Sequence, residues 1–568
     1  MNDMKDERRP QSIRPGSGRR KALAYPKGRH LEENEAEALK EILNGEPRVR
    51  DRLIEYLHLI QDRVGYLSSG LLQALAKELK IPMAEVYEVA SFYAHFDIVL
   101  DGEKPPEPIT IRVCESLSCA LAGAEDLISA LESASLPDTR ILRAPCMGRC
   151  DTAPVAEVGH NHVDRASAES VSSVVAAASF EPEVPDYPDL EAYRAEGGYQ
   201  ILQSCLQGET GVDQVIETLS DAGLRGLGGA GFPTGRKWSL VRAEPGPRLM
   251  AVNADEGEPG TFKDRYYLER EPHHMLEGAL IAAWAVEAEA IYIYLRDEYP
   301  AARKILLTEI AKLEEAGLSP HTKIHLRRGA GAYICGEESA MIESIEGKRG
   351  LPRHRPPYVA QVGIFDRPTL VNNVETLYWV PEILKNGVAW FADQGKGDSS
   401  GLRSYSVSGR VKEPGVKLAP AGVSVRELID DFCGGMEPGH EFKAYLPGGA
   451  SGGILPALMD DLPLDFGTLE SHGCFVGSHA VVIVSDQDDM KGVALNLMKF
   501  FEDESCGQCT PCRNGTEKAV KLMEAGIWQR EALADLSEVM AQASICGLGQ
   551  AAPNPLLCLL KYFPEEIQ

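Results

Sequence analysis

Six glycines fall within sixteen residues in the stretch Gly223-Leu-Arg-Gly-Leu-Gly-Gly-Ala-Gly-Phe-Pro-Thr-Gly-Arg-Lys-Trp238. Glycine permits positive φ and lets a ligand approach bare backbone, and backbone N–H groups beside a lysine suit a phosphate. The dinucleotide pattern G-x-G-x-x-G is present, but it requires a preceding strand, and residues 212–219 have helical spacing. The stretch predicts a phosphate-binding loop outside the usual Rossmann order, and a glycine-rich surface loop without a ligand is the alternative.

The composition is that of a water-soluble protein with several domains. A chain of 568 residues is too long for one core and predicts roughly three to five domains. It is 44% hydrophobic and 25% charged, and it has no apolar run of the length that a membrane span needs. The net charge of −27 argues against nucleic acid as a partner. We therefore expect a cytoplasmic protein with no membrane span.

Residues 1–30 differ from the rest of the chain because they hold nine Lys or Arg against three Asp or Glu. Such a segment is expected to be a disordered basic arm. It lacks the apolar region of a secretory signal. A solvated tail is favoured over a docking arm for an acidic partner subunit.

Eight of the thirteen cysteines have spacings typical of metal ligands. Nothing indicates secretion, so disulfides are not expected. The two sets are Cys114-x4-Cys119 with Cys146-x3-Cys150, and Cys506-x2-Cys509-x2-Cys512 with Cys546. The remaining five are scattered and are interpreted as small buried side chains: Cys205, Cys335, Cys433, Cys474 and Cys558.

The first cysteine set lies in a predicted small α/β domain with strands near residues 110–114, 140–143 and 154–158. Each cysteine pair can hold one iron of a [2Fe–2S] cluster, because inorganic sulfides complete both tetrahedral shells. Zinc is the competing metal, although its usual C-x2-C knuckles are tighter. His160 and His162 raise a Rieske alternative, which is disfavoured because four cysteines already complete the ligand set.

The second cysteine set lies in a C-terminal segment with helical spacing. Three cysteines in C-x2-C-x2-C bind three corners of a cubane, and Cys546 provides the fourth thiolate of a [4Fe–4S] cluster. A structural zinc site would not need the third closely spaced cysteine.

Three predicted buried strands, at residues 248–253, 290–295 and 323–327, indicate an open α/β sheet between the two cysteine sets. Such sheets bind ligands at the carboxyl ends of their strands. Asp255, Glu256 and Glu258 follow the first strand and are candidates for accepting hydrogen bonds from sugar hydroxyls, with a solvated acidic turn as the alternative. The third strand leads into a glycine turn and a helix, an order that suits a phosphate-bearing ligand.

The chain also resembles known proteins. Residues 50–160 contain Ile60-Gln-Asp-Arg-Val-Gly-Tyr66, Ala84-Glu-Val-Tyr-Glu-Val-Ala-Ser-Phe-Tyr93 and the first cysteine set. They resemble the small thioredoxin-like [2Fe–2S] subunit of the NADH-oxidising arm of respiratory complex I. From about residue 201 the chain is similar to the large flavoprotein subunit of that arm. This fusion is especially similar to the β subunit of NAD-dependent, molybdenum- or tungsten-containing formate dehydrogenases, including Glu413-Pro-Gly-Val-Lys-Leu-Ala-Pro420.

The resemblance implies an α/β multidomain fold. Its expected parts are a basic arm (1–30), a helical bundle (31–100), a thioredoxin-like [2Fe–2S] domain (108–180), a linker (181–200), a Rossmann-like FMN/NAD-binding domain (201–401), a ubiquitin-like β-grasp domain (402–486) and a helical [4Fe–4S] domain (487–568).

The resemblance also implies cofactor-binding residues. FMN is expected among Gly226, Gly228, Gly229, Lys237, Asn253, Asp255, Tyr333, Gly336, Glu337 and Glu338, with Asn372, Asn373 and Thr376 closing the far side. Glu256 is a further candidate. NAD(H) is expected to stack on the flavin against Phe232, near Lys237 and Glu258, with Tyr358 holding the adenine. No side chain need act as acid or base in hydride transfer, and Glu338 is hypothesised to tune the flavin by its charge.

Together these parts predict a converter of two-electron into one-electron transfer. The first interpretation is the diaphorase subunit of formate dehydrogenase, whose partner is a molybdopterin (Mo or W) formate-oxidising subunit with further iron–sulfur clusters. The alternative is the NADH-oxidising module of a bidirectional NAD-linked hydrogenase or an NADH-quinone oxidoreductase. A zinc-bearing assembly scaffold is the competing non-catalytic interpretation.

Overall fold

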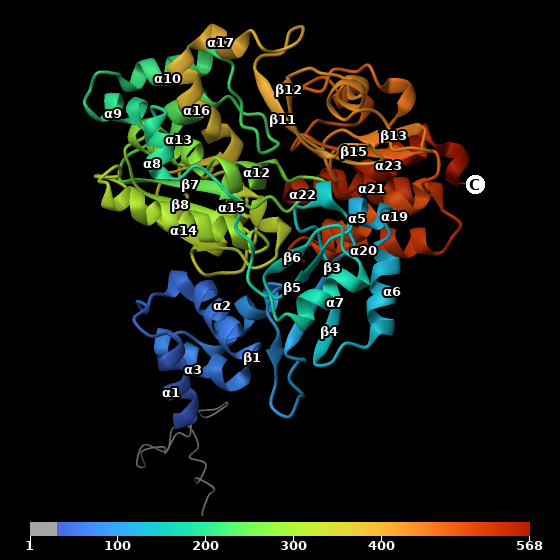
Figure 1. Cartoon of the computed structure of the whole chain (residues 1–568), viewed down its shortest axis with the longest axis horizontal. Helices are drawn as coiled ribbons and strands as arrows, with labels where there is room; N and C mark the ends of the chain where they lie inside the picture. The colour runs from blue at the N-terminus through green and yellow to red at the C-terminus, as the bar shows by residue number, and fades with distance from the viewer. Residues whose placement is uncertain (1–30, 568) are drawn as a thin grey trace, which may run out of the picture.

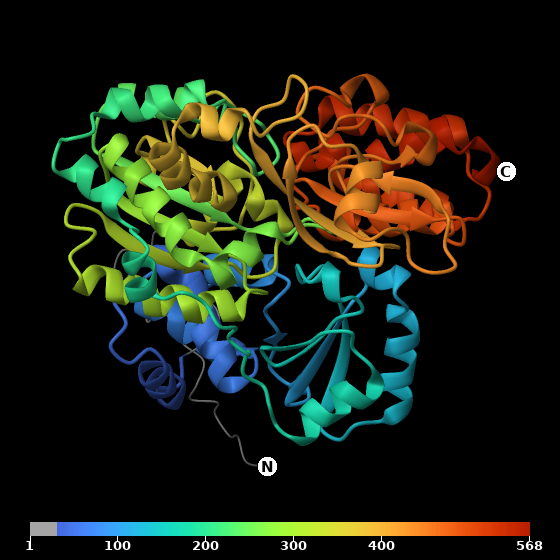
Figure 2. The same ribbon diagram turned by 45° about the horizontal axis from the view of Figure 1, so that its top comes forward.

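The computed structural model describes residues 31–567, so the predicted basic arm lies outside the described residues. Four groups of elements surround the middle of the molecule in Figures 1 and 2: the N-terminal bundle, a small α/β domain, a larger α/β domain, and a mixed sheet with the C-terminal helices. Within the described residues no helix has both the length and the apolar character needed to cross a membrane.

The N-terminal bundle packs its apolar stripes inward and lies against the larger α/β domain. Leu53, Leu57 and Ile60 are buried, and the φ of 90° at Gly65 ends their helix. Tyr93 reaches into the larger domain, where its hydroxyl donates to Ser344 Oγ at 2.8 Å. The elements are α1 (Glu33–Ile42), α2 (Leu53–Val64), α3 (Ser69–Leu79), α4 (Met83–Phe92) and the parallel pair β1 (Leu67–Ser68) and β2 (Ile98–Val99).

The small α/β domain has a four-stranded sheet in the order β4-β3-β5-β6, in which only β3 and β4 are parallel. The three predicted strands are present as β3, β4 and β5. The elements are β3 (Ile109–Cys114), α5 (Leu117–Leu121), α6 (Ala124–Ala134), β4 (Thr139–Ala144), β5 (Ala156–Val158), β6 (Asn161–Val163) and α7 (Ala168–Ala176).

Residues 181–200, expected to be a linker, contain α8 (Leu190–Ala195) and lie against the larger domain. Glu309 accepts hydrogen bonds from Tyr187 Oη at 2.9 Å and from the Leu190 N–H at 3.1 Å. The composition of residues 181–200 could not predict these hydrogen bonds, because their acceptor lies more than a hundred residues further along the chain.

The larger α/β domain has a parallel sheet in the order β10-β7-β8-β9. The predicted strands correspond to β7 (Arg248–Ala254), β8 (Ala288–Leu295) and β9 (Lys323–Arg328), and β10 (Thr369–Asn373) is added at one edge. The helices are α9 (Gln200–Leu206), α10 (Val212–Asp221), α11 (Thr234–Ala243), α12 (Lys263–Arg270), α13 (Pro272–Ala285), α14 (Pro300–Glu315), α15 (Glu338–Ile345), α16 (Val374–Asn386) and α17 (Val388–Ala392).

The mixed sheet has the order β12-β11-β15-β13-β14, with β11 and β15 parallel and the other neighbours antiparallel. Its elements are β11 (Leu402–Gly409), β12 (Gly415–Pro420), α18 (Val425–Glu427), β13 (Phe442–Leu446), β14 (Leu455–Pro456) and β15 (Ala480–Ser485). The helices that follow are α19 (Met490–Asp503), α20 (Thr510–Glu524), α21 (Arg530–Ala543), α22 (Gly547–Ala551) and α23 (Asn554–Tyr562). Short 3-10 and π turns connect these elements, namely Arg50–Arg52, Cys150–Thr152, Tyr333–Gly336, Ile364–Asp366, Leu428–Phe432, Ala457–Met459, Glu470–His472 and Pro564–Ile567.

Candidate functional site

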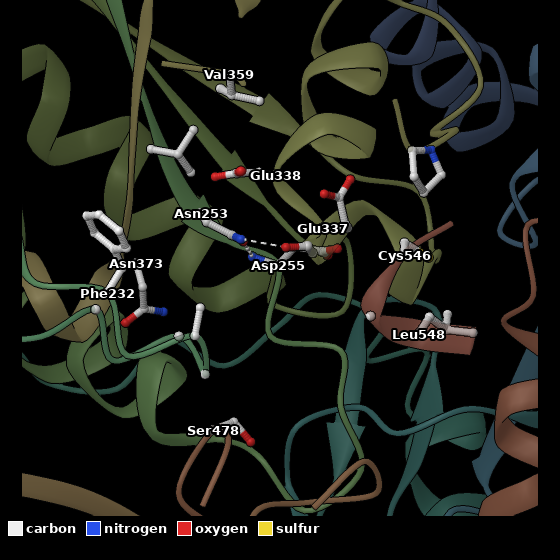
Figure 3. Close-up of a pocket in the computed structure, with 18 of the residues that line it drawn as sticks. Phe232, Asn253, Asp255, Glu337, Glu338, Val359, Asn373, Ser478, Cys546 and Leu548 are labelled. Carbon is white, nitrogen blue, oxygen red and sulfur yellow. Dashed lines mark hydrogen bonds between the residues drawn. The ribbon is translucent and has the colours of Figure 1, made fainter. Parts of the chain in front are cut away.

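A cavity of about 1340 Å³ opens at the carboxyl ends of the parallel strands. Its walls come from the glycine loop, the ends of β7 and β10, the start of α15, and two later segments at residues 475–478 and 545–554. In Figure 3, Phe232 and Asn373 lie on one side of this cavity, and Cys546 and Leu548 on the other. The cavity therefore joins three of the predicted domains.

The glycine loop closes on itself before α11 begins. The Gly226 N–H donates to the Phe232 carbonyl at 2.8 Å, and the Thr234 N–H donates to the Leu224 carbonyl at 2.9 Å. Gly229 has a φ of 120°, which L side chains rarely adopt. Helix α10 precedes the loop, so the strand that the dinucleotide fingerprint requires is not there. The loop instead directs backbone and the first turn of α11 toward the cavity.

The predicted cofactor residues converge on this one cavity, with Thr376 as the exception. Those that line it are Gly226, Gly228, Gly229, Phe232, Lys237, Asn253, Asp255, Glu256, Glu258, Tyr333, Gly336, Glu337, Glu338, Tyr358, Asn372 and Asn373. Thr376 lies behind the glycine loop, where its Oγ1 accepts a hydrogen bond from the Leu227 N–H at 2.8 Å. Its contact is with the loop and not with the cavity.

Lys237 lies near the start of α11 and directs its cationic end to the edge of β10. Its Nζ donates to the Val371 carbonyl at 3.1 Å. Burial lowers the pKa of Lys237, and Glu338 opposes that shift. One carbonyl leaves two ammonium hydrogens for a ligand, and the site has room for an anionic group beside it.

The three acidic residues after β7 have different surroundings. Asp255 Oδ2 is buried with no hydrogen-bond partner, and burial raises the pKa of Asp255 well above its usual range. Glu256 accepts from the Asp264 N–H at 2.8 Å and the Tyr299 hydroxyl at 2.8 Å, and burial raises its pKa to about 7. Glu258 accepts from the Ser451 N–H at 2.8 Å. Asp255 is therefore the one of the three whose carboxyl group is available to a bound molecule.

The turn before α15 combines a helix cap with a paired cation. Glu337 caps α15 by accepting from the Ser339 and Ala340 N–H groups at 3.0 and 2.9 Å. Arg355 pairs with Glu337 and lies 3.0 Å from Glu338 Oε1. The Asn253 side chain donates to the Gly336 carbonyl at 2.8 Å, which ties this turn to β7 (Figure 3). Two carboxylates and one guanidinium thus border the cavity here.

The first cysteine set is gathered at one end of the small sheet. Cys114, Cys119, Cys146 and Cys150 are all buried, and the Sγ atoms of Cys146 and Cys150 lie 3.3 Å apart. Four buried thiols without a disulfide among them fit a [2Fe–2S] cluster. His162 is half-buried, and desolvation of its ring lowers its pKa to about 3. It is not needed as a ligand because the thiols complete the set.

The second cysteine set lines a small enclosed space between the C-terminal helices. Cys506, Cys509, Cys512 and Cys546 all face it, together with Ile334 and Pro352 of the larger domain. Cys546 also lines the large cavity. The donor set fits a [4Fe–4S] cluster, whose site would adjoin the large cavity directly.

Several cavity residues could not be identified from local sequence. No site residues were predicted from residues 402–486, and packing against the flavin domain was the expected role, yet Ser451, Phe475, Gly477 and Ser478 line the cavity. Ser451 and Ser478 both donate to Glu258, so this segment closes the cavity over residues 255–258, the acidic turn after β7. The glycine-rich stretch around Ser451 was the only signal. Arg353, His354 and Arg355 also line the cavity, and nothing in their spacing indicated it.

His58 and His95, interpreted as structural histidines from the sequence, lie with Asp62 where the bundle meets the larger domain. Their potential ligand atoms are within 4.8 Å of one another. Arg328 already supplies a cation there, because it pairs with Asp62 at 2.6 Å and also with Asp297. The cluster is therefore an ion-pair junction between domains.

Three family descriptions match the chain. The Nuo51 FMN-binding domain matches residues 219–382, the thioredoxin-like [2Fe–2S] ferredoxin matches residues 39–179, and the NADH-ubiquinone oxidoreductase-F iron–sulfur binding region matches residues 492–568. These matches confirm the predicted FMN, [2Fe–2S] and [4Fe–4S] cofactors and support NADH as the substrate.

Two solved structures show the same architecture over nearly the whole chain. The NAD+-reducing [NiFe]-hydrogenase in its H2-reduced state is 33% identical, with a TM-score of 0.80, and the match covers 92% of each chain. The air-oxidised state has a TM-score of 0.79 at 32% identity, covering 92% of this chain and 94% of that one. These likenesses favour the alternative interpretation and do not support the formate dehydrogenase interpretation.

The flavoprotein part, about two thirds of the chain, has curated relatives among the NADH-quinone oxidoreductases. One such protein of Rhizobium meliloti is 43% identical over 408 residues, covering 68% of this chain and 97% of the relative. Its counterpart in Aquifex aeolicus is 40% identical, covering 67% and 91%, and that of Escherichia coli is 41% identical, covering 67% and 89%. The chain belongs to the family of NADH-oxidising flavoproteins of the NADH-quinone oxidoreductases.

Proposed function

We propose that this chain is the NADH-oxidising module of a multisubunit oxidoreductase, which receives hydride from NADH and passes single electrons to a partner. The observation that carries this proposal is the continuity of the site. One cavity extends from the glycine loop to Cys546, and the Cys146 loop is held against the acidic turn of the same cavity by Arg296. A two-electron site thus adjoins both candidate one-electron sites.

Bound FMN would supply hydride acceptance and one-electron release. The protein's contribution is placement and exclusion of water. The glycine-loop backbone and Lys237 would hold the phosphate, and Asp255 offers an unpartnered carboxyl oxygen to the cofactor. Phe232 keeps 37% of its surface exposed at the cavity wall, which suits stacking of a nicotinamide ring. Ser451 and Ser478 hold the covering segment over the site through Glu258.

The share of this chain that each relative covers indicates which kind of partner to propose. The NADH-quinone oxidoreductase relatives cover about two thirds of this chain, whereas the hydrogenase chain also covers the N-terminal parts. We therefore propose that the partner belongs to an NAD-linked hydrogenase or to an NADH-quinone oxidoreductase. A molybdopterin formate-oxidising partner stays a prediction from resemblance.

We propose the domain bounds that were predicted from the sequence, with one change. Residues 181–200 are assigned to the flavin domain because α8 packs against α14 of that domain. We also infer that residues 402–486 form a β-grasp domain. The order β12-β11-β15-β13-β14, with a central parallel pair and a short helix after the first hairpin, supports this inference.

The test begins with the purified full-length chain. NADH should bleach a flavin absorption band, and EPR of the reduced protein should show signals of both cluster types. A protein that contains zinc, with no flavin and no EPR signal, would instead support the scaffold interpretation.

A second experiment identifies the partner by tagging this chain in its native host and analysing what copurifies. Nickel with H2-dependent NAD+ reduction would indicate a hydrogenase, and quinone-dependent NADH oxidation would indicate a quinone oxidoreductase. Molybdenum or tungsten with formate-dependent NAD+ reduction is the third possible result. The third result would overturn the proposed partner and restore the formate dehydrogenase interpretation.

A further inference from the structure

Arg296 connects the first cysteine set to the cavity through two of its three hydrogen bonds. It follows β8 and is 4% exposed. Its Nη2 donates to the Cys146 carbonyl at 2.6 Å, its Nη1 donates to the Glu256 carbonyl, and its Nε donates to Glu298 Oε2 at 3.1 Å. One guanidinium therefore touches the cysteine loop and the acidic turn of the cavity at once.

The charge of Arg296 is only partly compensated. Two of its three acceptors are neutral carbonyls, and the third is the Glu298 carboxylate, which is 17% exposed. A buried charge in a region of low dielectric acts strongly on neighbouring charges. Positive potential from Arg296 therefore reaches both the Cys146 loop and the acidic turn.

Arg265 makes a comparable contact with the same loop but carries less uncompensated charge. Its Nε donates to the Gly148 carbonyl at 2.7 Å. Two carboxylates neutralise it, Asp151 at 3.0 Å and Glu269 at 3.1 Å. Arg265 thus docks the loop by hydrogen bonding, and comparison of the two arginines separates docking from charge.

We propose that Arg296 is a positioning residue that sets the reduction potential of the [2Fe–2S] site while holding its loop on the cavity wall. One-electron reduction adds a negative charge to a cluster that already has four thiolate ligands, and a fixed buried cation stabilises the reduced form. The potential of the site is then higher than its thiolates alone would allow. This inference rests on the proposed assignment of Cys114, Cys119, Cys146 and Cys150 as the cluster ligands.

The test is an EPR-monitored redox titration of the [2Fe–2S] signal in the full-length protein, with FMN and iron content measured alongside. Arg296→Gln should lower the equilibrium constant for one-electron reduction about tenfold, which is ~59 mV for one electron. Arg296→Lys keeps the charge and should stay close to the wild-type potential. Glu298→Gln removes the compensating negative charge and should shift the potential upward. Arg265→Gln is the matched control and should shift it by much less than Arg296→Gln.

Opposite shifts of the potential in Arg296→Gln and Glu298→Gln would establish the electrostatic role. A shift caused by lost packing would not change direction according to the sign of the charge removed. Wild-type potentials in both variants, or shifts in the same direction, would overturn it. If Arg296→Gln does not assemble its cluster, Glu298→Gln decides: an unchanged potential overturns the proposal. Absence of a [2Fe–2S] signal from the wild-type protein would instead show that the cluster assignment is wrong.

Discussion

The Leu227 N–H donates a hydrogen bond to Thr376 Oγ1 at 2.8 Å, and both residues are fully buried. This contact joins the middle of the glycine loop to the first turn of α16, although the residues are 149 positions apart. It makes the shape of the loop depend on a helix that follows the last strand of the parallel sheet.

Replacement of Thr376 by Val should weaken FMN binding about tenfold. Valine keeps the volume but leaves the Leu227 N–H without a partner, and an unsatisfied buried donor costs ~1–3 kcal/mol. Titration of the FMN-depleted protein with FMN measures the change. Thr376→Ser retains the hydroxyl and should bind like the wild type. Equal affinity of the Val and Ser variants would show that the hydrogen bond does not shape the loop.

Replacement of Lys237 by Ala should lower both FMN content and NADH oxidation, because Lys237 is the half-buried cation of the loop and faces the cavity. We expect a loss of at least about tenfold in kcat/KM for NADH, the size of one charge-assisted hydrogen bond. Arg242 lies on the same helix outside the cavity lining, and Arg242→Ala serves as the control for loss of a positive charge from α11. Full FMN content and full activity in Lys237→Ala would contradict the proposed role.

Glu338→Gln should raise the flavin midpoint potential, since it removes a negative charge from the cavity wall. Arg355 offsets part of that charge, so we expect a shift of ~30 mV, which is about tenfold for two electrons. Spectroelectrochemistry measures the shift. Glu289→Gln removes an exposed charge that pairs with Arg367, and neither residue lines the cavity, so this variant should leave the potential unchanged. A wild-type potential and NADH oxidation rate in Glu338→Gln would remove the tuning hypothesis.

Stability should decrease as pH rises through the titration of Glu256. Its pKa is about 7 in the folded chain against 4.5 for the ordinary carboxyl group. Between these values the folded state holds a proton that the unfolded state has released, so the free energy of unfolding falls with rising pH by about 3 kcal/mol at most. Thermal unfolding of wild type and Glu256→Gln at pH 5 and pH 7.5 measures it. The wild type should lose more stability than the variant; parallel behaviour would refute the prediction.

Single cysteine replacements should separate the two clusters. Cys509→Ala should abolish the [4Fe–4S] EPR signal and spare the [2Fe–2S] signal, and Cys119→Ala should do the reverse, because each site requires four thiolates. Cys205→Ala changes a buried thiol outside both sets and should retain both signals. Loss of both signals in either ligand variant, with FMN retained, would show that the sites are not independent.

The sequence alone determined features that depend on short spacing. The strands β7, β8 and β9 were predicted to within a few residues because apolar runs are local. Both cysteine sets were proposed from the short spacings inside 114/119, 146/150 and 506/509/512. The helical character of α10 likewise excluded the ordinary dinucleotide order before any tertiary contact was known.

Only the tertiary structure decided which of these pieces meet. Ser451 and Ser478 reach the cavity through Glu258, Cys546 joins the cluster space to the cavity, and Arg296 contacts Cys146 from 150 positions away. Thr376 proved to support the glycine loop from behind it. Such contacts depend on how whole domains pack, and that packing is set by the sum of many weak contacts between distant segments, which leave no periodic signal in the chain.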